Sequence, residues 1–293
     1  MIERRKRVNN NGTRKITSLT VRRIIAYIAL ILLAFICLFP FYILIVNATR
    51  AHSAIQQGFS FLPGGSFMAN WNKLMANENL PVLLAMFNSF FIAASTALLP
   101  TYFSALTAYA IHAYNFKLRK PAITFILMIM MVPTQVSALG FVRQMNTMGL
   151  DDSFIPLIIP SIASPVVFFF MLQYMESALP IEIIEASRID GSGEFRTFNR
   201  IVLPIVKPAM SVQAIFAFVN SWNNYFIPNL ILESKDKKTL PILIAQLRSA
   251  DFMKFDMGQV YILIALAIVP VLIVYLFFSK YIVQGVAIGS VKG

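Results

Sequence analysis

Residues 179–204, LPIEIIEASRIDGSGEFRTFNRIVLP, carry seven charged side chains and lie between two long apolar runs. Pro180 at a first-turn position, with Glu182 close behind, predicts a helix start, because both residue types suit the N-terminal turn of a helix. Gly191 can adopt the left-handed conformation that ends this helix, and Ser192 can cap a second short helix after it. The segment therefore predicts a helix-turn-helix elbow.

Three apolar residues of the second helix, Phe195, Phe198 and Val202, recur every three or four positions and predict one apolar face. This helix is expected to end near Pro204 and Pro208, where the next apolar run begins, because proline interrupts the hydrogen-bond ladder of a helix. The periodicity alone permits two interpretations. The elbow either docks a protein or lies as an amphipathic linker against the lipid headgroups.

The composition of the whole chain argues strongly against a soluble enzyme. Of its 293 residues, 58% are apolar and 13% are charged, whereas soluble domains are about 45–50% apolar and about 25% charged. A hydrocarbon core of ~30 Å requires about 20 apolar residues in a helix, and the alternation typical of membrane strands is absent. We therefore expect an all-α membrane protein with six transmembrane helices, at residues 24–46, 85–107, 122–143, 154–175, 208–230 and 259–282.

Two of these six spans contain prolines that disturb a helix. The fourth carries Pro156, Pro160 and Pro165, so its first half is expected to be kinked or broken. Pro133 should act similarly on the third span, and the carbonyl groups that it frees must find partners in neighbouring helices or water. The first span is longer than the core of a signal peptide, and we expect it to be a retained anchor.

The basic residues predict the orientation of the chain. The formal net charge is +12, and 17 of the 25 lysines and arginines lie in segments on the same side as the two termini. Because basic loops stay on the cytoplasmic side of a membrane, both termini and the elbow, about residues 177–207, are expected to be cytoplasmic. We interpret the basic tail at residues 1–23 as an orientation signal rather than an arm that binds nucleic acid.

The sequence contains none of the motifs of a metalloprotease, a nucleophile elbow or an ATP-binding loop. Cys37 is the one cysteine, and His52 and His112 have no acidic or cysteine partner at ligand spacing, so we expect no catalytic residue and no metal site. No glycine is followed by lysine, which excludes the Walker loop. If this chain moves a solute uphill, another subunit must supply the energy.

The elbow resembles the EAA loop of permease subunits in binding-protein-dependent ABC importers, whose pattern is E-A-A-x3-G-x9-I-x-L-P. One position departs from the pattern, where Ser187 replaces the second alanine with another small residue. Seven fixed positions over twenty residues, in the predicted loop, make the match specific. The residues at these seven positions are Glu185, Ala186, Ser187, Gly191, Ile201, Leu203 and Pro204.

Further stretches are similar to the MalG-like permeases of carbohydrate importers, and this resemblance covers roughly residues 40–293. Each stretch is weak alone, but their order and their positions at the ends of the predicted spans are specific. They are Ala108-Tyr109-Ala110, Met131-Val132-Pro133-Thr134-Gln135, Gly149-Leu150, Ile189-Asp190-Gly191, Trp222-Asn223, Thr239-Leu240-Pro241 and Val291-Lys292-Gly293.

The resemblance implies a multi-pass permease of the bacterial inner membrane, of the MetI-like type, with its transmembrane domain at residues 24–293. A second homologous permease would complete the translocation pathway, and an extracytoplasmic solute-binding protein would deliver a carbohydrate, most readily an oligosaccharide. Two ATPase subunits would carry ATP and Mg, while this chain would bind no cofactor and would not be an enzyme. The residues that would couple it to the ATPases are Glu185, Ala186, Ser187, Asp190, Gly191, Phe195, Phe198, Ile201, Leu203 and Pro204.

Polar and aromatic residues inside apolar spans are the candidates for the solute path, because sugars bind through hydrogen bonds and ring stacking. The same residues can instead form hydrogen bonds between helices or, for the aromatic ones, anchor the chain at the membrane interface. The candidates are Asn220, Trp222, Asn223, Asn224 and Tyr225 in the fifth span, and Thr134 and Gln135 beside Pro133. Small residues at four-residue spacing in the second span are expected to pack against helices of this chain: Ala93, Ala97, Thr101 and Ala105.

Three other functions remain open at this stage. An ABC permease for a non-sugar solute shares the EAA spacing, so that motif does not choose the solute. A polytopic membrane enzyme is disfavoured, because clusters of carboxylates in the spans and loops are missing. A self-sufficient secondary carrier is disfavoured because no ionisable relay lies inside the membrane.

Overall fold

The computed structural model describes residues 2–249 and 256–290, with side chains at residues 20–249 and 256–279. Every regular element in these ranges is a helix, which confirms the expected all-α fold. Within the described residues, five helical segments are long and apolar enough to cross a membrane, and a bent pair of helices gives a sixth candidate. The side chains of residues 1–19 and the stretch Val291-Lys292-Gly293 lie outside the described part.

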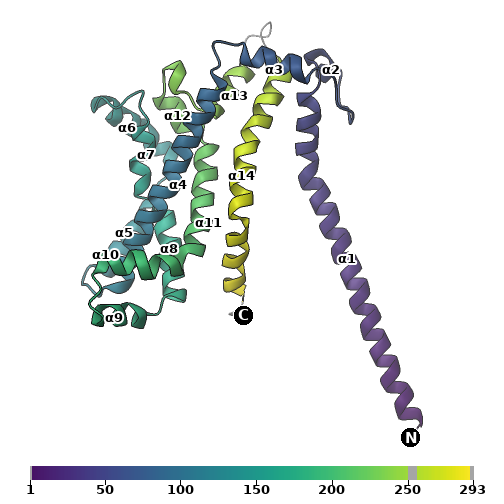
Figure 1. Ribbon diagram of the computed structural model, residues 1–293, viewed down its shortest axis with the longest axis vertical. Helices are drawn as coiled ribbons and strands as arrows, with labels where there is room; N and C mark the ends of the chain where they lie inside the picture. Colours follow the sequence, from purple (N-terminus) through teal and green to yellow (C-terminus); the bar gives the residue numbers. More distant parts are fainter. Residues whose placement is uncertain (1, 250–255, 291–293) are drawn as a thin grey trace. The chain divides into compact units, whose positions relative to one another are not determined.

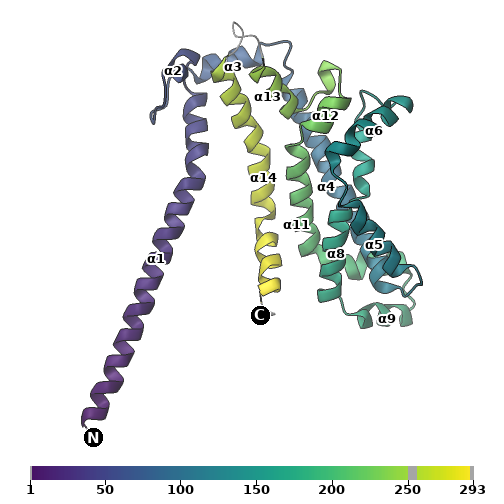
Figure 2. The ribbon, with the colours of Figure 1, turned by 180° about the vertical axis from the view of Figure 1, so that it is seen from behind.

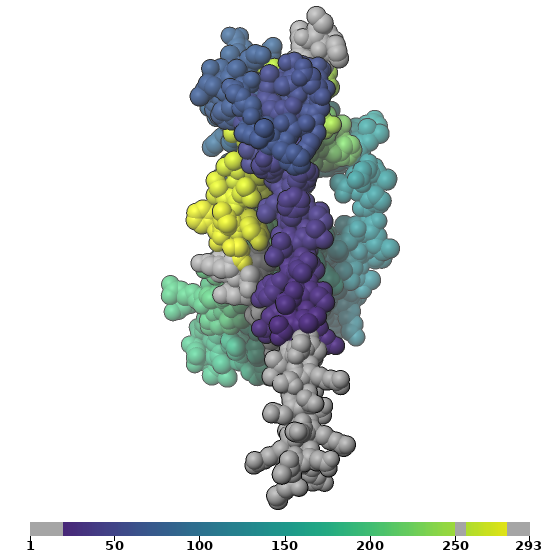
Figure 3. Space-filling model, turned by 90° about the vertical axis from the view of Figure 1, so that its right-hand side faces the viewer, coloured from purple at the N-terminus to yellow at the C-terminus, as the bar shows by residue number. Residues whose placement is uncertain are grey.

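The chain divides into two compact units, the first of which comprises the residues up to Trp71 together with Met257–Ala265. It contains α1 (Ile2–Ala48), α2 (His52–Gln56) and the first turns of α3 (Phe67–Met75) and of α14 (Met257–Ser290). Figure 3 looks onto α1 and shows the following segment gathered at its C-terminal end. Asn70 connects α3 to the C-terminal end of α1, since its Nδ2 donates hydrogen bonds to the carbonyls of Ala48 and Arg50 at 3.2 and 2.8 Å.

The second unit runs from Asn72 to Asp256 and resumes at Leu266. Its central helix is α4 (Val82–Ala113), which packs along α8 (Pro165–Ala178) and α11 (Leu203–Trp222), as Figure 1 shows. The four small residues of α4 at positions 93, 97, 101 and 105 are all buried within this chain. The prediction that they serve packing inside the chain is therefore confirmed, and they let the neighbouring helices approach closely.

The predicted third span is not a continuous helix. It consists of α5 (Arg119–Ile129) and α6 (Thr134–Thr147), which meet at an angle of 93° (Figure 2). Pro133 stands at this bend as the N-cap residue of α6, in agreement with the expected disturbance. The fourth span is also broken at its prolines, into α7 (Ile155–Ile158), a 3₁₀ turn (Pro160–Ile162) and α8.

The fifth span begins earlier than predicted. A continuous helical segment runs from Glu194 to Trp222, so the predicted helix end near Pro204 and Pro208 is wrong. The turn before Pro204, Phe198–Val202, is a π-helical turn. Such a wide turn accommodates the ring and the missing amide hydrogen of Pro204, whereas Pro208 lies inside α11 itself.

The helical segment ends at Trp222, and a short helix, α12 (Phe226–Ile231), follows after a break. The sequence placed three of the pathway candidates inside the fifth span, but in the structure they lie between two helices: Asn223, Asn224 and Tyr225. Beyond α12, a 3₁₀ turn (Lys235–Lys237) and α13 (Leu240–Arg248) complete the second unit before α14.

Candidate functional site

The elbow consists of α9 (Ile181–Ile189) and α10 (Glu194–Thr197), joined by a tight turn. Gly191 has φ of +76°, and no atom lies within 4 Å of the position that a Cβ would take. The turn closes with two backbone bonds, from the amide of Gly191 to the carbonyl of Arg188 and from Ser192 to Ser187. This Schellman arrangement needs a residue that accepts positive φ, so glycine is required here by its backbone conformation and not by crowding.

Three hydroxyl groups connect the two helices of the elbow. Ser187 is buried, and its Oγ donates to the carbonyl of Ile184 at 2.7 Å and lies 3.2 Å from Oγ1 of Thr197. The Thr197 hydroxyl donates to Oγ of Ser192 at 3.0 Å. The prediction that Ser192 caps this helix is therefore wrong. Gly193 is the N-cap residue of α10, and it has no side-chain cap.

The predicted apolar face of the second helix is divided between the surface and the core. Phe195 is 70% exposed, whereas Phe198 and Val202 are fully buried. The ring of Phe198 lies between those of Tyr102 and Tyr109 on α4, with centroid distances of 5.6 and 5.5 Å. Phe198 therefore holds the elbow on α4 and is not available to a partner, which corrects the prediction for this residue.

A different set of side chains forms the exposed face of the elbow. Ile189 is 86% exposed, and Glu185, Ala186, Asp190 and Gly191 also lie on the surface. Ile201 and Leu203 are half-buried, and Pro204 is exposed. Ile189 was not among the predicted coupling residues, because it directly precedes the Asp190-Gly191 turn and falls outside the apolar repeat of the second helix.

A cluster that we name the elbow latch, formed by Tyr109, Tyr114, Arg188 and Glu194, connects the elbow to α4. The Tyr109 hydroxyl donates to Oε2 of Glu194 at 2.6 Å, and Nε of Arg188 donates to Oε1 of the same carboxylate at 2.7 Å. The Arg188 guanidinium also lies 5.0 Å from the centroid of the Tyr114 ring. No sequence pattern pointed to this cluster, because its members come from three separate elements.

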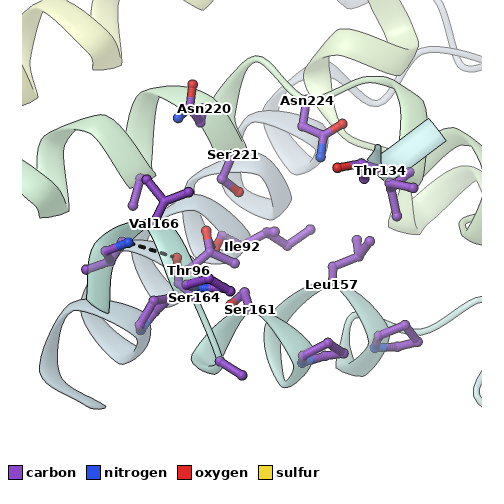
Figure 4. Close-up of a pocket in the computed structure, with 18 of the residues that line it drawn as sticks. Ile92, Thr96, Thr134, Leu157, Ser161, Ser164, Val166, Asn220, Ser221 and Asn224 are labelled. Atoms are coloured by element: carbon purple, nitrogen blue, oxygen red, sulfur yellow. Dashed lines mark hydrogen bonds between the residues drawn. The ribbon is translucent and has the colours of Figure 1, made fainter. Parts of the chain in front are cut away.

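A cavity of about 680 Å³ lies between α4, α6, the broken fourth span, α11 and α12. Figure 4 shows Ser221 pointing into it from α11, opposite the turn that carries Ser161 and Ser164. Figure 1 places α9 and α10 at the opposite end of α4 from α6 and α12. The polar side chains that line the cavity are Thr96, Thr134, Ser137, Ser161, Ser164, Gln213, Asn220, Ser221 and Asn224.

Three of the seven predicted pathway residues line this cavity: Thr134, Asn220 and Asn224. Trp222 is buried elsewhere, where its Nε1 donates to the carbonyl of Ala267 on α14 at 3.0 Å. The alternative interpretation, a hydrogen bond between helices, therefore holds for Trp222.

The other three pathway candidates are not cavity-lining residues. The Asn223 side chain donates to the carbonyl of Val219 at 3.0 Å, one turn back on the same helix. Gln135 and Tyr225 are exposed and are not among the side chains that line the cavity.

Among the described residues, Gln213 is one of six polar cavity residues that the sequence did not predict, together with Thr96, Ser137, Ser161, Ser164 and Ser221. It is 9% exposed, yet its side-chain amide makes no hydrogen bond within the described part of the chain. Its spacing to Asn220 is seven residues, which places both side chains on one face of α11. Extending the predicted cluster backwards by this period would have found it.

A second polar cluster joins two loops at the end of the second unit away from the elbow. Asp152 accepts hydrogen bonds from the amides of Glu233 and Ser234, both at 3.0 Å, and from Nζ of Lys237 at 3.0 Å. Burial alone would raise the pKa of the Asp152 carboxyl, but the hydrogen bonds from Ser234, Lys237 and Glu233 outweigh it and hold this pKa well below its usual range.

We predict that Asp152→Asn lowers the melting temperature of the purified protein at pH 7 and that the difference persists at pH 5. The folded-state pKa is depressed, so the ionised carboxyl stabilises the fold above its unfolded pKa of about 3.9, and this stabilisation is lost as the pH falls through the folded-state value. Asp152 has φ of 47°, which asparagine tolerates. Asp151→Asn, at an exposed neighbour, is the control and should show no such difference.

Comparison with known proteins identifies the chain. The family model described as "Binding-protein-dependent transport system inner membrane component" matches residues 101–288. The arabinooligosaccharides transport system permease protein AraQ of Bacillus subtilis (strain 168) is 33% identical, and the alignment covers 94% of this chain and 97% of AraQ. The lactose transport system permease protein LacG of Rhizobium radiobacter is 31% identical, with coverage of 93% and 99%.

One solved structure agrees with the fold. The crystal structure of a bacterial ABC transporter involved in the import of the acidic polysaccharide alginate superposes with a TM-score of 0.77. The match covers 89% of this chain and 96% of that one at 21% identity, a likeness that concerns the fold. The family match and the relationship to AraQ show that this chain belongs to the inner-membrane permease components of binding-protein-dependent transport systems.

Proposed function

We propose that this chain forms half of the translocation pathway of an ABC importer for a neutral carbohydrate. A second permease would form the other half, and a solute-binding protein would deliver the substrate. The names of AraQ and LacG, transport permeases for arabinooligosaccharides and lactose, support a carbohydrate substrate. Membership of a transport family identifies the chain as a transport component and not an enzyme.

The chemistry of the cavity is the observation that carries this proposal. Hydroxyl and amide groups both donate and accept hydrogen bonds, which suits the hydroxyl groups of a sugar. Among the described residues that line the cavity, none carries a charge. A carboxylated sugar would have no cationic partner on these walls, so the lining favours a neutral solute over an acidic one.

The elbow is the proposed contact with the ATPase subunits. Ile189 and Phe195 expose two large apolar side chains beside the acidic Glu185, and such a surface suits a protein cleft that covers apolar groups and offers a basic or backbone donor. ATP-driven closure of the two ATPases would then move the elbow and switch the permease between its inward-facing and outward-facing states. This assignment places the elbow, and with it both termini, in the cytoplasm of a bacterial cell, which agrees with the distribution of basic residues.

Uptake by the assembled transporter tests this function. The complex that co-purifies with this chain is reconstituted in liposomes with ATP inside the lumen reached by the ATPases, and uptake is measured for a neutral and an acidic oligosaccharide of equal length. We expect ATP-dependent uptake of the neutral one. ATP-dependent uptake of only the acidic oligosaccharide would contradict the substrate assignment, and activity of the lone chain without ATP would contradict the ABC mechanism.

We predict that Gln213→Leu lowers uptake roughly five- to tenfold, the size expected for the loss of a hydrogen bond to the solute, without lowering the melting temperature of the complex. Leucine removes a cavity-lining amide that makes no hydrogen bond within the described part of the protein, so the fold itself loses no bond. Gln144→Leu, at an exposed position of α6, is the matched control and should leave uptake unchanged. A loss of stability equal to the loss of uptake would show that Gln213 serves packing.

A further inference from the structure

We propose that Glu194 is a positioning residue for energy coupling, because its carboxylate, held by Tyr109 and Arg188, joins the elbow to α4 so that both move together. This inference rests on the proposed function and extends it to the route by which movement at the elbow reaches the cavity. The side chains involved all lie in the second unit.

The Glu194 carboxylate bridges elements that are far apart in the sequence. One oxygen accepts a bond from Arg188 on α9, and the other accepts a bond from Tyr109 on α4, 85 residues earlier in the chain. Both distances, 2.7 and 2.6 Å, fall in the range of hydrogen bonds strengthened by charge. A displacement of α9 therefore pulls on α10 and α4 through one group.

A second contact secures the same junction two helical turns away. Tyr102, seven residues before Tyr109 on the same face of α4, donates its hydroxyl proton to Oδ1 of Asn199 at 3.1 Å. Asn199 in turn donates to the carbonyl of Phe195 at 2.8 Å. With the ring of Phe198 between the two tyrosines, α4 holds residues 194–199 at two levels, which resists rotation as well as sliding.

The other half of α4 forms part of the cavity wall. Ile92, Thr96 and Pro100 line the cavity from this helix. Thr96 precedes Tyr109 by thirteen residues, which corresponds to about 20 Å of helix. One helix thus contacts the elbow at one end and the cavity at the other, so a displacement of the latch can reach the cavity wall without passing through a loop.

The elbow latch also contains one hydrogen-bond donor that is not used within the described residues. Nη2 of Arg188 is buried and has no hydrogen-bond partner within the described part of the chain. The guanidinium can therefore form a further bond when the elbow shifts, while its Nε keeps Glu194. A bond formed after such a shift would give the cluster a second arrangement, as a switching element requires.

The test measures ATP hydrolysis and solute uptake in the same liposomes, with the assembled transporter carrying Glu194→Gln or Tyr109→Phe. Each change keeps the size of the side chain and weakens or removes the bond between the carboxylate and α4. We expect hydrolysis to stay within about twofold of wild type and uptake to fall roughly five- to tenfold, so that more ATP is consumed for each solute molecule. The double variant should be no worse than the stronger single variant, because both changes break the same bond.

Two matched controls lie on α8. Glu176→Gln changes an exposed carboxylate that accepts a hydrogen bond from Gln173 at 3.1 Å and lies 3.9 Å from Arg119, away from the elbow latch. Tyr174→Phe removes the hydroxyl of a half-buried tyrosine. Both should leave the ratio of ATP consumed to solute imported unchanged.

The ratio of ATP to solute separates coupling from a merely structural role. A parallel fall of hydrolysis and uptake, or an unchanged ratio in both latch variants, would overturn the coupling role of Glu194 while leaving the importer function standing. A wild-type complex without ATP-driven uptake would overturn both. Yield and size-exclusion profiles of each complex show whether a variant has assembled, and an assembled Tyr109→Phe complex decides the question if Glu194→Gln does not assemble.

Discussion

The Gly191→Val variant is expected to lose at least roughly tenfold in ATP-driven uptake while still inserting into the membrane. Gly191 has φ of +76°, and a β-branched side chain in the left-handed region costs ~1–2 kcal/mol or more. The turn can relieve this strain only by changing its backbone, which displaces Ile189 and Asp190 from their places on the exposed face. Uptake in liposomes, with the amount of inserted protein measured in parallel, gives the size of the effect.

Gly193→Val is the matched control, two residues away. Gly193 has φ of −69° and ψ of 151°, an extended conformation that valine prefers, and a Cβ there meets no atom within 4 Å. This variant should transport at the wild-type rate. Equal losses in the two variants would mean that any side chain in this turn disturbs transport, and the argument from backbone conformation would be wrong.

The second large effect separates two phenylalanines that are three residues apart. Phe198→Ala is expected to destabilise the protein by about 3–5 kcal/mol, because a fully buried aromatic side chain leaves a cavity between two tyrosines of α4. The purified complex should show a clearly lower melting temperature and a lower yield.

Phe195→Ala tests the opposite expectation. Phe195 is 70% exposed, so its removal should leave the melting temperature within one or two degrees, since exposed substitutions change stability by about 0.5 kcal/mol or less. Uptake should fall nonetheless if Phe195 contacts an ATPase. A stable variant with normal uptake would show that this side chain is not part of the docking surface.

The contrast between these residues shows what sequence periodicity can and cannot predict. Repeats of apolar residues locate a helix face, but whether that face meets a partner or another part of the same chain depends on contacts distant in the sequence. Phe198 is buried by Tyr102 and Tyr109, about ninety residues earlier. The all-helical character and the breaks at Pro133 and in the fourth span were predictable, because they follow from local composition and from proline itself.

The errors at the start of the fifth span have a common physical cause. Proline is a reliable helix breaker in α-geometry, yet the π-helical turn over Phe198–Val202 carries the helix through Pro204. Ser192 is a good N-cap by residue type, but its hydroxyl is taken by Thr197. In both cases a tertiary or geometric alternative outweighs the local preference, and a single sequence contains no signal for it.

The cavity was predicted in part for a similar reason. Asn220 and Asn224 stand out as amides in an apolar run, whereas Ser161 and Ser164 come into the cavity only because the broken fourth span turns there. Small hydroxyl residues next to prolines are common in loops, so the sequence positions of these two serines did not indicate that they line a cavity. The helical period on α11 contained the remaining signal, in Gln213.

The uncharged lining of the cavity has an electrical consequence. A membrane potential of 100 mV acts on each moving unit charge with about 2.3 kcal/mol, but it does no work on a neutral solute passing between uncharged walls. Among the described residues, the cavity lining contains no lysine, arginine, aspartate or glutamate that a conformational change would carry across the field. Solute passage through this half of the pathway should therefore be insensitive to voltage, so that a cell which loses its membrane potential but retains ATP would continue to import through it.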